Sequence, residues 1–311
     1  MTAAPDEDLD LRTAEALLRR TAAVVVSFNT VNSLRQCLAT LRGAGAGRAM
    51  AVIVVDNASE DGSVEMVRED FPDVVLVESP ENLGFGRAVN LGAERADRDF
   101  LVTLNPDVLA PPLSLARLSR RLDADPGLGF AGPRILKANG TVDHASLRGD
   151  PDPAGAALYF TRVARLFPRS PRLNRYNLAH LDYNTEHDLL SGTGGCLAFR
   201  TEAFRQVGGF DPNFFMYGED LDLCRRVRAA GWRGVYLPSA SVVHAKGEAT
   251  RQHSGEMLVE FHRAMWTYYV KHEAGQHPRP FNWLVAAGIG GLAGARLAAN
   301  AIRREKRVSA R

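Results

Sequence analysis

The chain alternates short runs of consecutive apolar residues with segments in which apolar residues recur every three or four positions. A continuous apolar run of strand length is typical of a parallel strand covered on both faces, and the second pattern is typical of an amphipathic helix. Strands are therefore expected at residues 22–26, 52–55, 74–77 and 100–104. Helices are expected at residues 33–41, 63–70 and 85–96. This alternation predicts an α/β fold with a mostly parallel, Rossmann-like central sheet flanked by helices.

Beyond residue 111 the pattern is looser. A stretch rich in Pro, Arg and Asp at 149–188 is interpreted as a long excursion near the site, either a lid or an acceptor surface. Ordered segments return as strands at 196–199 and 235–237, with a helix from 219 to 230 between them. The predicted organisation has a mobile N-terminal arm, one domain and a C-terminal helical extension, which cover residues 1–20, 21–250 and 251–311.

Composition narrows the class of protein. Of the 311 residues, 24% are charged and 45% are hydrophobic, as in an ordinary globular protein. The net charge of +2 gives no reason to expect nucleic-acid binding. The three cysteines are odd in number and form no CxxC pair, which fits a reduced cytosolic chain. The acidic N-terminus lacks the pattern of a signal peptide.

The C-terminal segment is apolar and then basic. Its apolar part, from Trp283 to Ala295, is short and rich in glycine for a membrane-spanning helix. The basic residues that follow are Arg296, Arg303, Arg304, Lys306, Arg307 and Arg311. This combination is typical of a helix at a membrane surface, with its apolar side in the acyl chains and its cationic end near anionic lipid. A packing or dimerisation helix, which would make the protein a homodimer, explains the pattern equally well.

Three carboxylates, Glu219, Asp220 and Asp222, lie within four residues at the start of the predicted helix 219–230. The aromatic residues at 214–217 indicate a partly buried position. Carboxylates held close together near apolar surface have raised or split pKa values, as a general base requires. Asp222 lies about one turn beyond Glu219, whereas Asp220 points elsewhere, so we expect these acids to have different roles. The alternative is that they only stabilise a helix N-terminus.

Two separate loops offer ligands for a divalent cation. The sequence Asn105-Pro106-Asp107 follows the strand 100–104, and His244 follows another short apolar run. Mg²⁺ and Mn²⁺ bind few carboxylates together with substrate phosphates, so Asp107 is the predicted metal ligand, with Asn105 nearer the sugar. Only the presence of Asp107 makes His244 a candidate second ligand. Taken alone, each is better explained as a turn or as a structural histidine.

Two further loops are candidates for binding a nucleotide. Asp56 ends the strand 52–55, where its carboxylate can accept the N3–H of uracil or thymine; the alternative is a helix cap. The loop from Asn82 to Arg87, which contains Gly84, opens a helix, so its N–H groups and Arg87 can face an anion. This loop matches neither a Walker sequence nor GxGxxG, and by itself it is better explained as a tight turn.

Six short segments in this order carry a resemblance to a known family. They are Val-Val-Val-Ser-Phe-Asn, Val-Val-Asp-Asn-Ala-Ser-Glu-Asp-Gly-Ser, Glu-Asn-Leu-Gly-Phe-Gly, Leu-Asn-Pro-Asp-Val, Gly-Gly-Phe-Asp and Tyr-Gly-Glu-Asp-Leu-Asp-Leu-Cys-Arg-Arg. From about Ala22 to Gly247, the sequence resembles family 2 glycosyltransferases of the GT-A fold, in the rhamnosyltransferase branch. The usual Asp-x-Asp of the family is Asn-Pro-Asp here, as is common in this branch. After His244, the frequent small polar ending is replaced by Glu-Ala-Thr at 248–250.

The resemblance implies a role for each candidate residue. Contacts to the nucleotide are implied for Phe28, Asn29, Asp56 and Asn82. The metal, Mg²⁺ or Mn²⁺, would be held by Asp107 and His244. Asp220 would be the catalytic base, and Asp222 with Arg226 would orient the base and its helix. Residues 21–110 would form the half that binds the nucleotide sugar, and residues 111–250 the half that provides the acceptor and catalytic sites.

The implied reaction is transfer of L-rhamnose from dTDP-L-rhamnose, with inversion, to a hydroxyl of a glycan linked to polyprenyl diphosphate. Such a step belongs to cell-wall or surface polysaccharide assembly, and we expect a cytoplasmic protein that is peripheral at the inner face of the plasma membrane. One alternative is a UDP-sugar donor, with galactofuranose or GlcNAc, because Asp56 cannot separate uracil from thymine. The other alternative is a catalytically silent nucleotide-binding scaffold subunit.

Overall fold

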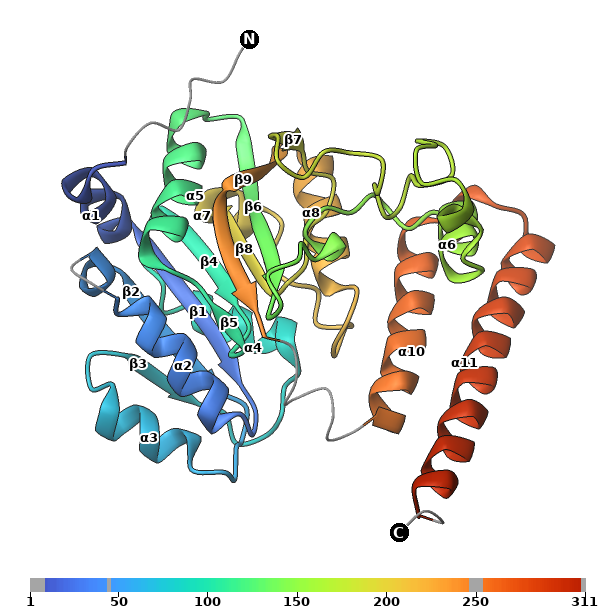
Figure 1. The fold of residues 1–311 in the computed structure, drawn as a ribbon, viewed down its shortest axis with the longest axis horizontal. Coiled ribbons are helices and arrows are strands. Elements are labelled where there is room, and N and C mark those ends of the chain that lie inside the picture. The colour runs from blue at the N-terminus through green and yellow to red at the C-terminus, as the bar shows by residue number, and fades with distance from the viewer. Residues whose placement is uncertain (1–8, 44–45, 246–253, 309–311) are drawn as a thin grey trace.

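A computed structural model describes residues 9–43, 46–245 and 254–308. In this part of the chain, a central sheet lies between two layers of helices, and a pair of C-terminal helices stands beside them (Figure 1). The strands are β1 (Thr21–Ser27), β2 (Ala51–Asp56), β3 (Val75–Glu78), β4 (Phe100–Leu104), β5 (Val108–Leu109), β6 (Leu128–Lys137), β7 (His187–Asp188), β8 (Cys196–Arg200) and β9 (Arg233–His244). The α-helices are α1 (Leu11–Arg19), α2 (Val31–Leu41), α3 (Ser63–Asp70), α4 (Phe85–Ala93), α5 (Pro112–Ala124), α6 (Pro153–Phe160), α7 (Thr201–Gln206), α8 (Glu219–Ala229), α10 (Ser254–His272) and α11 (Arg279–Val308). The predicted α/β fold with a C-terminal helical extension is confirmed.

The strands follow the order β3-β2-β1-β4-β8-β6-β9-β5, and β7 pairs with β9 at the side. The first four strands in this order are parallel, as the alternating sequence pattern predicts. Strand β8 runs antiparallel to both of its neighbours, and β6 and β9 are again parallel. The carboxyl ends of β1 and β4 therefore meet at one edge of the sheet, where α/β folds bind their ligands.

The core has two parts, one on each face of the sheet. Strand β1 is buried along its whole length, and its successive side chains point to opposite faces. Ala23 and Val25 pack with apolar residues of α1, α2, α3 and α5. Ala22 and Val24 pack with apolar residues of α4, α7 and α8 on the other face. Burial on both faces explains why these strands are continuous apolar runs in the sequence.

The predicted N-terminal arm over residues 1–20 contains the helix α1. Asp10 caps the helix, because its carboxylate accepts the backbone N–H groups of Arg12 and Thr13. Leu17 and Leu18 are buried in the core against the sheet face that α5 also covers. A helix with so few apolar residues is stable here because the protein covers its apolar face. Residues 1–8 of the predicted arm lie outside the described part.

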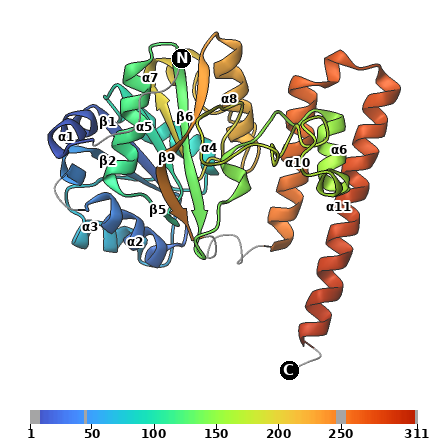
Figure 2. The same cartoon turned by 45° about the horizontal axis from the view of Figure 1, so that its top comes forward.

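Helices α10 and α11 form an antiparallel pair, and α6 lies against it (Figures 1 and 2). Helix α11 is longer than the short apolar segment in the sequence indicates, because it continues without interruption for 30 residues. Within this helix, residues 279–301 have a mean hydropathy of 1.3, and none of the residues in their most apolar stretch is buried inside the protein. By length and composition, this is the one helix in the described residues that could cross a membrane.

Candidate active site

A cavity of about 1060 Å³ opens at the carboxyl ends of β1 and β4 and extends to the C-terminal helices. The sequence-predicted residues that line it are Phe28, Asn82, Gly84, Asn105, Asp107, Glu219, Asp220 and His244. The fold therefore brings together residues from loops far apart in the sequence. Asn29, Asp56, Arg87 and Asp222 were also predicted for the site, but they do not line this cavity.

Asp107 and His244 lie side by side on paired strands. The two-residue strand β5 runs antiparallel to the end of β9, which places Val108 opposite His244. The backbone N–H of Ala245 donates to the carbonyl of Asp107, and His244 Nε2 lies 3.0 Å from Asp107 Oδ1. The imidazole also packs under Gly195, where an added Cβ would lie 3.2 Å from its Cε1 atom. Both side chains are thus fixed at the cavity wall.

This pair fits a divalent cation that takes its other ligands from a substrate. One carboxylate oxygen and one imidazole nitrogen suit Mn²⁺, and a single carboxylate with substrate phosphates suits Mg²⁺. No group of three or more His, Cys, Asp or Glu side chains in the described residues could hold a metal ion without such help. His244 Nδ1 is buried and has no hydrogen-bond partner in the described residues, so no described residue orients the ring through this nitrogen.

Asp220 faces the cavity from the first turn of α8. The helix begins after Tyr217 and Gly218, which both have positive φ, 69° and 76°. This sharp entry turns the first residues of the helix toward the cavity. The backbone N–H of Gly194 donates to Asp220 Oδ2 over 2.9 Å, and the N–H of Leu221 donates to Oδ1 over 2.8 Å. Both oxygens accept backbone hydrogen bonds, which fix the orientation of the Asp220 side chain.

Glu219 lines the cavity next to Asp220 and is in a different state. Its side chain is buried, and Oε2 has no hydrogen-bond partner in the described residues. Burial, and secondarily the charge of Asp220, raise the pKa of Glu219 from 4.5 to about 8. Glu219 therefore carries a proton at neutral pH, whereas a general base must be unprotonated. The expectation that these neighbouring acids differ in role stays a prediction.

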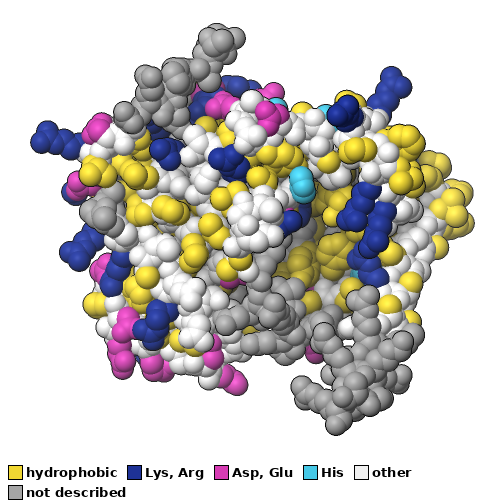
Figure 3. Space-filling model, viewed as in Figure 1, with side chains coloured by type: hydrophobic (Ala, Val, Ile, Leu, Met, Phe, Trp, Pro, Cys, Tyr) yellow, Lys and Arg dark blue, Asp and Glu magenta, His cyan; other side chains and the backbone are white. Residues whose placement is uncertain are grey.

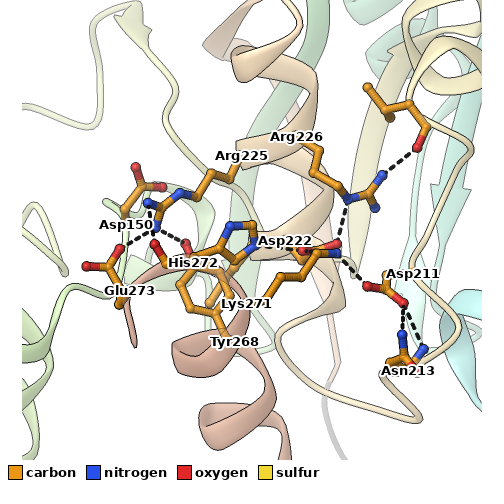
Figure 4. Close-up of polar contacts among 12 residues, drawn as sticks. Asp150, Asp211, Asn213, Asp222, Arg225, Arg226, Tyr268, Lys271, His272 and Glu273 are labelled. Atoms are coloured by element: carbon orange, nitrogen blue, oxygen red, sulfur yellow. Dashed lines mark hydrogen bonds and ion pairs between the residues drawn. The ribbon is translucent and has the colours of Figure 1, made fainter. Parts of the chain in front are cut away.

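Asp222 lies on α8 away from the cavity and joins α8 to α10 (Figure 4). Its fully buried carboxylate receives Arg226 Nε on Oδ2, and His272 Nε2 and Lys271 Nζ on Oδ1, each at 2.7 Å. Burial alone would raise the pKa of Asp222, but the hydrogen bonds from His272 and Lys271 and the charge of Arg226 lower it to about 2. Asp222 thus holds the C-terminal pair in place.

Asp56 offers a buried acceptor at the end of β2. Its Oδ2 accepts the N–H of Ser59 over 2.8 Å, whereas Oδ1 has no partner in the described residues. The N-cap residue of α3 is Gly62, so Asp56 does not cap that helix. Asn29 has a positive φ of 51°, and its side-chain oxygen accepts the N–H of Glu60, which ties the loop after β1 to the loop after β2.

The loop before α4 is held by close backbone contact. Gly84 has a φ of +79°, and a Cβ at this position would lie 2.2 Å from the carbonyl oxygen of Phe215. Asn82 accepts the N–H of Gly84 through its side-chain oxygen and lines the cavity. Arg87 points away from the cavity and donates to the carbonyl of Pro212. A structural role for Arg87 follows, in place of the anion contact that its sequence position favours.

Arg148 is a cavity residue that the sequence analysis did not identify. It follows no recognisable motif, and it is brought to the cavity by the bridge between its own backbone and that of Ser191. The inner sides of α6, α10 and α11 form the rest of the wall. Hydrophobic side chains gather over α10 and α11 and line the hollow beside the sheet domain (Figure 3). The helical spacing of Met257, Phe261, Ala264 and Tyr268 could have revealed the inner side of α10.

Comparisons of the sequence with known proteins show the family of the chain. The sequence model of glycosyl transferase family 2 matches residues 22–208, and that of the N-terminal domain of galactosyltransferase matches residues 175–249. The N-acetylglucosaminyl-diphospho-decaprenol L-rhamnosyltransferase of Mycobacterium tuberculosis is 32% identical over 277 residues, which cover 86% of this chain and 89% of the relative. The rhamnosyltransferase WbbL of Escherichia coli (strain K12) is 43% identical over 51 residues, 16% of this chain and 19% of that protein.

A solved structure shows the same arrangement of strands and helices. The mannosyltransferase PcManGT of Pyrobaculum calidifontis, determined in complex with GDP-Man and Mn²⁺, superposes with a TM-score of 0.57 at 21% identity. The superposition covers 94% of this chain and 81% of the mannosyltransferase. At this identity the likeness shows the fold, and it confirms the predicted GT-A-like architecture.

Proposed function

Because the chain belongs to glycosyl transferase family 2, we propose that it transfers L-rhamnose from dTDP-L-rhamnose, with inversion, to a hydroxyl of a polyprenyl-diphosphate-linked glycan. The observation that carries this proposal is the position of Asp220, which lines the same cavity as the Asp107–His244 pair. The mycobacterial relative, by its name, transfers L-rhamnose to a decaprenyl-diphosphate-linked sugar, which supports the choice of donor sugar and acceptor class.

In the proposed reaction, an acceptor hydroxyl beside Asp220 attacks the anomeric carbon of the donor. A new C–O bond forms as the bond to the diphosphate breaks, and the hydroxyl proton passes to the Asp220 carboxylate. The N–H groups of Gly194 and Leu221 hold that carboxylate in one orientation, so that its approach to the hydroxyl is preorganised. Protonated Glu219 adds no second negative charge next to the base at neutral pH.

Asp107 and His244 are the residues that would hold Mg²⁺ or Mn²⁺. When bound, the ion supplies positive charge for the diphosphate as it departs. Asn105 lies beside the pair, because its N–H donates to the carbonyl of Gly195, against which His244 packs. We assign Asn105 a contact to the donor sugar.

The donor nucleotide is assigned to residues 21–110, and the acceptor and catalytic residues to 111–250. Among the described residues, Asp56 Oδ1 is a buried acceptor without a partner, which suits the N3–H of a pyrimidine. Phe28 and Asn82 line the cavity on the same side and complete the nucleotide contacts with Asn29. The residues at 248–250, whose sequence departs from the family pattern, lie outside the described part.

Residues 251–311 are assigned to contact with the membrane that contains the acceptor. Trp283 and Leu284, on α11, are 70% and 71% exposed, and such residues insert into the interfacial region of a bilayer. We therefore place the protein at the inner face of the plasma membrane as a peripheral enzyme. A homodimer through α11 remains a prediction.

The test is a turnover assay with a panel of nucleotide sugars and a polyprenyl-diphosphate-linked GlcNAc acceptor, with and without Mn²⁺. We expect metal-dependent transfer from dTDP-L-rhamnose that falls by about a thousandfold or more in Asp220→Asn, as loss of a general base requires. The matched control is Asp188→Asn, an exposed carboxylate on β7, which should transfer at the wild-type rate.

Three results would change the proposal. Transfer from a UDP-sugar alone would keep the mechanism and replace the donor, since Asp56 fits both pyrimidines. Equal rates for wild type and Asp220→Asn would remove Asp220 as the base. Absence of transfer from every donor, with nucleotide binding retained, would favour a catalytically silent scaffold.

A further inference from the structure

Beyond Asp220, the cavity wall changes from polar to apolar. On the side of β1 and β4 the wall carries the polar residues described above, whereas the other side is apolar. Among its residues are Ala157 and Phe160 of α6, Phe261 and Met265 of α10, and Val285 and Ile289 of α11. Helix α6 and the C-terminal helices α10 and α11, which are distant from α6 in sequence, therefore line an apolar groove that is continuous with the site of proton transfer.

The groove is not closed by packing between its walls. On α11, Gly288 lines the cavity, and a Cβ added there would meet no atom within 4 Å. Leu284 lines the cavity and is still 71% exposed. The volume of about 1060 Å³ lies at the upper end of the range, roughly 300–1000 Å³, that holds drug-sized ligands. An open apolar surface of this kind in a folded protein marks a binding site.

The polar end of the groove contains an unpaired cation. Arg148 lines the cavity, and its charge interacts with that of Asp220. Within the described residues, no carboxylate forms an ion pair with its guanidinium. A partly buried guanidinium with free donors is suited to the oxygens of a phosphate or diphosphate.

We propose that the inner sides of α6, α10 and α11 hold the isoprenoid chain of the acceptor lipid, and that Arg148 binds its diphosphate. This inference rests on the proposed function, because it concerns the lipid-linked acceptor assigned there. This assignment follows the order of groups in such a lipid. A sugar hydroxyl lies at Asp220, the diphosphate at Arg148, and the hydrocarbon chain between the helices.

Several features favour a hydrocarbon chain over a protein segment as the occupant. The groove runs from the reacting carboxylate to α11, on which Trp283 and Leu284 are 70% and 71% exposed. A lipid can thus pass from the bilayer to the site without leaving apolar surroundings. Met257 and Met265 line the groove with flexible side chains, which adapt to a flexible chain. Arg296 lies over the rings of Phe160 and Phe261, at 5.4 and 5.8 Å from their centroids, and keeps a cation beside the groove for anionic headgroups.

The kinetic test compares two acceptors that carry the same sugar and diphosphate, one with a decaprenyl chain and one with a geranyl chain. Gly288→Trp places an indole in the groove, and the matched control Gly290→Trp places it two residues away on α11, where it does not line the cavity. Neither glycine has an atom within 4 Å of an added Cβ, so both variants should fold.

We expect Gly288→Trp to lower kcat/KM for the decaprenyl acceptor by about tenfold or more through KM, with a smaller effect on the geranyl acceptor. Gly290→Trp should match wild type with both. The proposal would be overturned if Gly288→Trp lowered kcat/KM equally for the two acceptors, or if the two variants lowered it equally. It would also be overturned if Gly288→Trp left kcat/KM unchanged. Arg148→Gln should raise KM for both acceptors; a raised KM for the nucleotide sugar alone would assign Arg148 to the donor and remove it from the proposal.

A binding test separates this inference from the proposed function. A benzophenone-bearing polyprenyl diphosphate is cross-linked to the full chain in detergent, and the labelled peptides are mapped by mass spectrometry. Labels on the inner sides of α6, α10 and α11 support the groove, whether or not sugar is transferred. Labels confined to the exposed side around Trp283 would show general membrane contact and overturn it. If transfer to the lipid-linked acceptor occurs without labelling of the groove, the proposed function is supported and the proposed binding of lipid in the groove is overturned.

Discussion

Replacing Glu219 with glutamine removes an ionisable group from the most buried part of the candidate active site. The Glu219 side chain is 6% exposed, and its Oε2 atom has no hydrogen-bond partner within the described ranges. Burial and the charge of neighbouring Asp220 raise the pKa of Glu219 from 4.5 to about 8. Glutamine has nearly the same shape and is neutral at every pH, so the change isolates the cost of ionisation.

The sign of the effect follows from the two states of the chain. Below pH 4.5, Glu219 is protonated in both the folded and the unfolded protein, and its contribution to stability is fully present. As the pH rises from 4.5 to 8, the unfolded chain releases this proton while the folded chain keeps it, so the free energy of unfolding falls. One pKa unit corresponds to about 1.4 kcal/mol, which gives an upper limit of ~5 kcal/mol at pH 8.

The assay is urea denaturation at pH 4.5 and at pH 8, without nucleotide or divalent cation. We expect Glu219→Gln to be more stable than wild type at pH 8, by roughly 2–5 kcal/mol, and about equal to it at pH 4.5. The control Glu202→Gln, at an exposed position on α7, should show no such pH dependence. A stability difference of the same size at both pH values would refute the reasoning, because it could not come from ionisation.

Three further predictions concern residues that hold the candidate site in place or contact the membrane. Asp222→Asn should lower the free energy of unfolding by about 3 kcal/mol at pH 7, since it leaves Arg226, Lys271 and His272 without their buried carboxylate. In urea denaturation this cost should shrink as the pH falls from about 4 toward 2, because the low pKa of Asp222 stabilises the fold only while the carboxylate is ionised. Gly84→Ala should lower the melting temperature well beyond Gly140→Ala, because both have φ near +80° but only Gly84 would bring a Cβ against the carbonyl of Phe215. Trp283→Glu should weaken co-sedimentation with anionic vesicles while leaving the melting temperature in solution unchanged, because this side chain is 70% exposed.

The parallel half of the fold could be predicted from the sequence because its strands are buried on both faces. The continuous apolar runs that became β1 and β4 have one physical interpretation, and their carboxyl ends then locate the candidate site. Asp107 and His244 could be named as candidates, but their proximity could not be derived. The strand β5 that joins them has two residues, too few to give a periodic signal.

Other features depend on tertiary contacts that no local pattern reports. Helix α1 has few apolar residues in its sequence, yet its apolar face is buried because α5 provides a partner for it. Arg148 lies in an irregular segment, and only the folded chain brings it to the cavity. The apolar C-terminal residues were interpreted as a membrane surface or a dimer contact, and one side of them proves to line the cavity. Periodicity identifies an apolar face but not what the face contacts.

Helix α8 connects these observations, because its successive residues serve two different surfaces. Asp220 points into the cavity, and two residues later Asp222 binds His272 and Lys271 of α10 from the opposite side (Figure 4). A rigid helix cannot move one carboxylate without the other, so the position of the candidate base is tied to the position of the C-terminal pair. Helices α10 and α11 also form much of the apolar cavity wall beyond Asp220. If the groove holds the acceptor lipid, the contact that docks α10 onto α8 also sets the distance between lipid and base. A substitution that removes the contacts of Asp222 with α10 should therefore reduce transfer to the lipid-linked acceptor more than it reduces binding of the donor nucleotide.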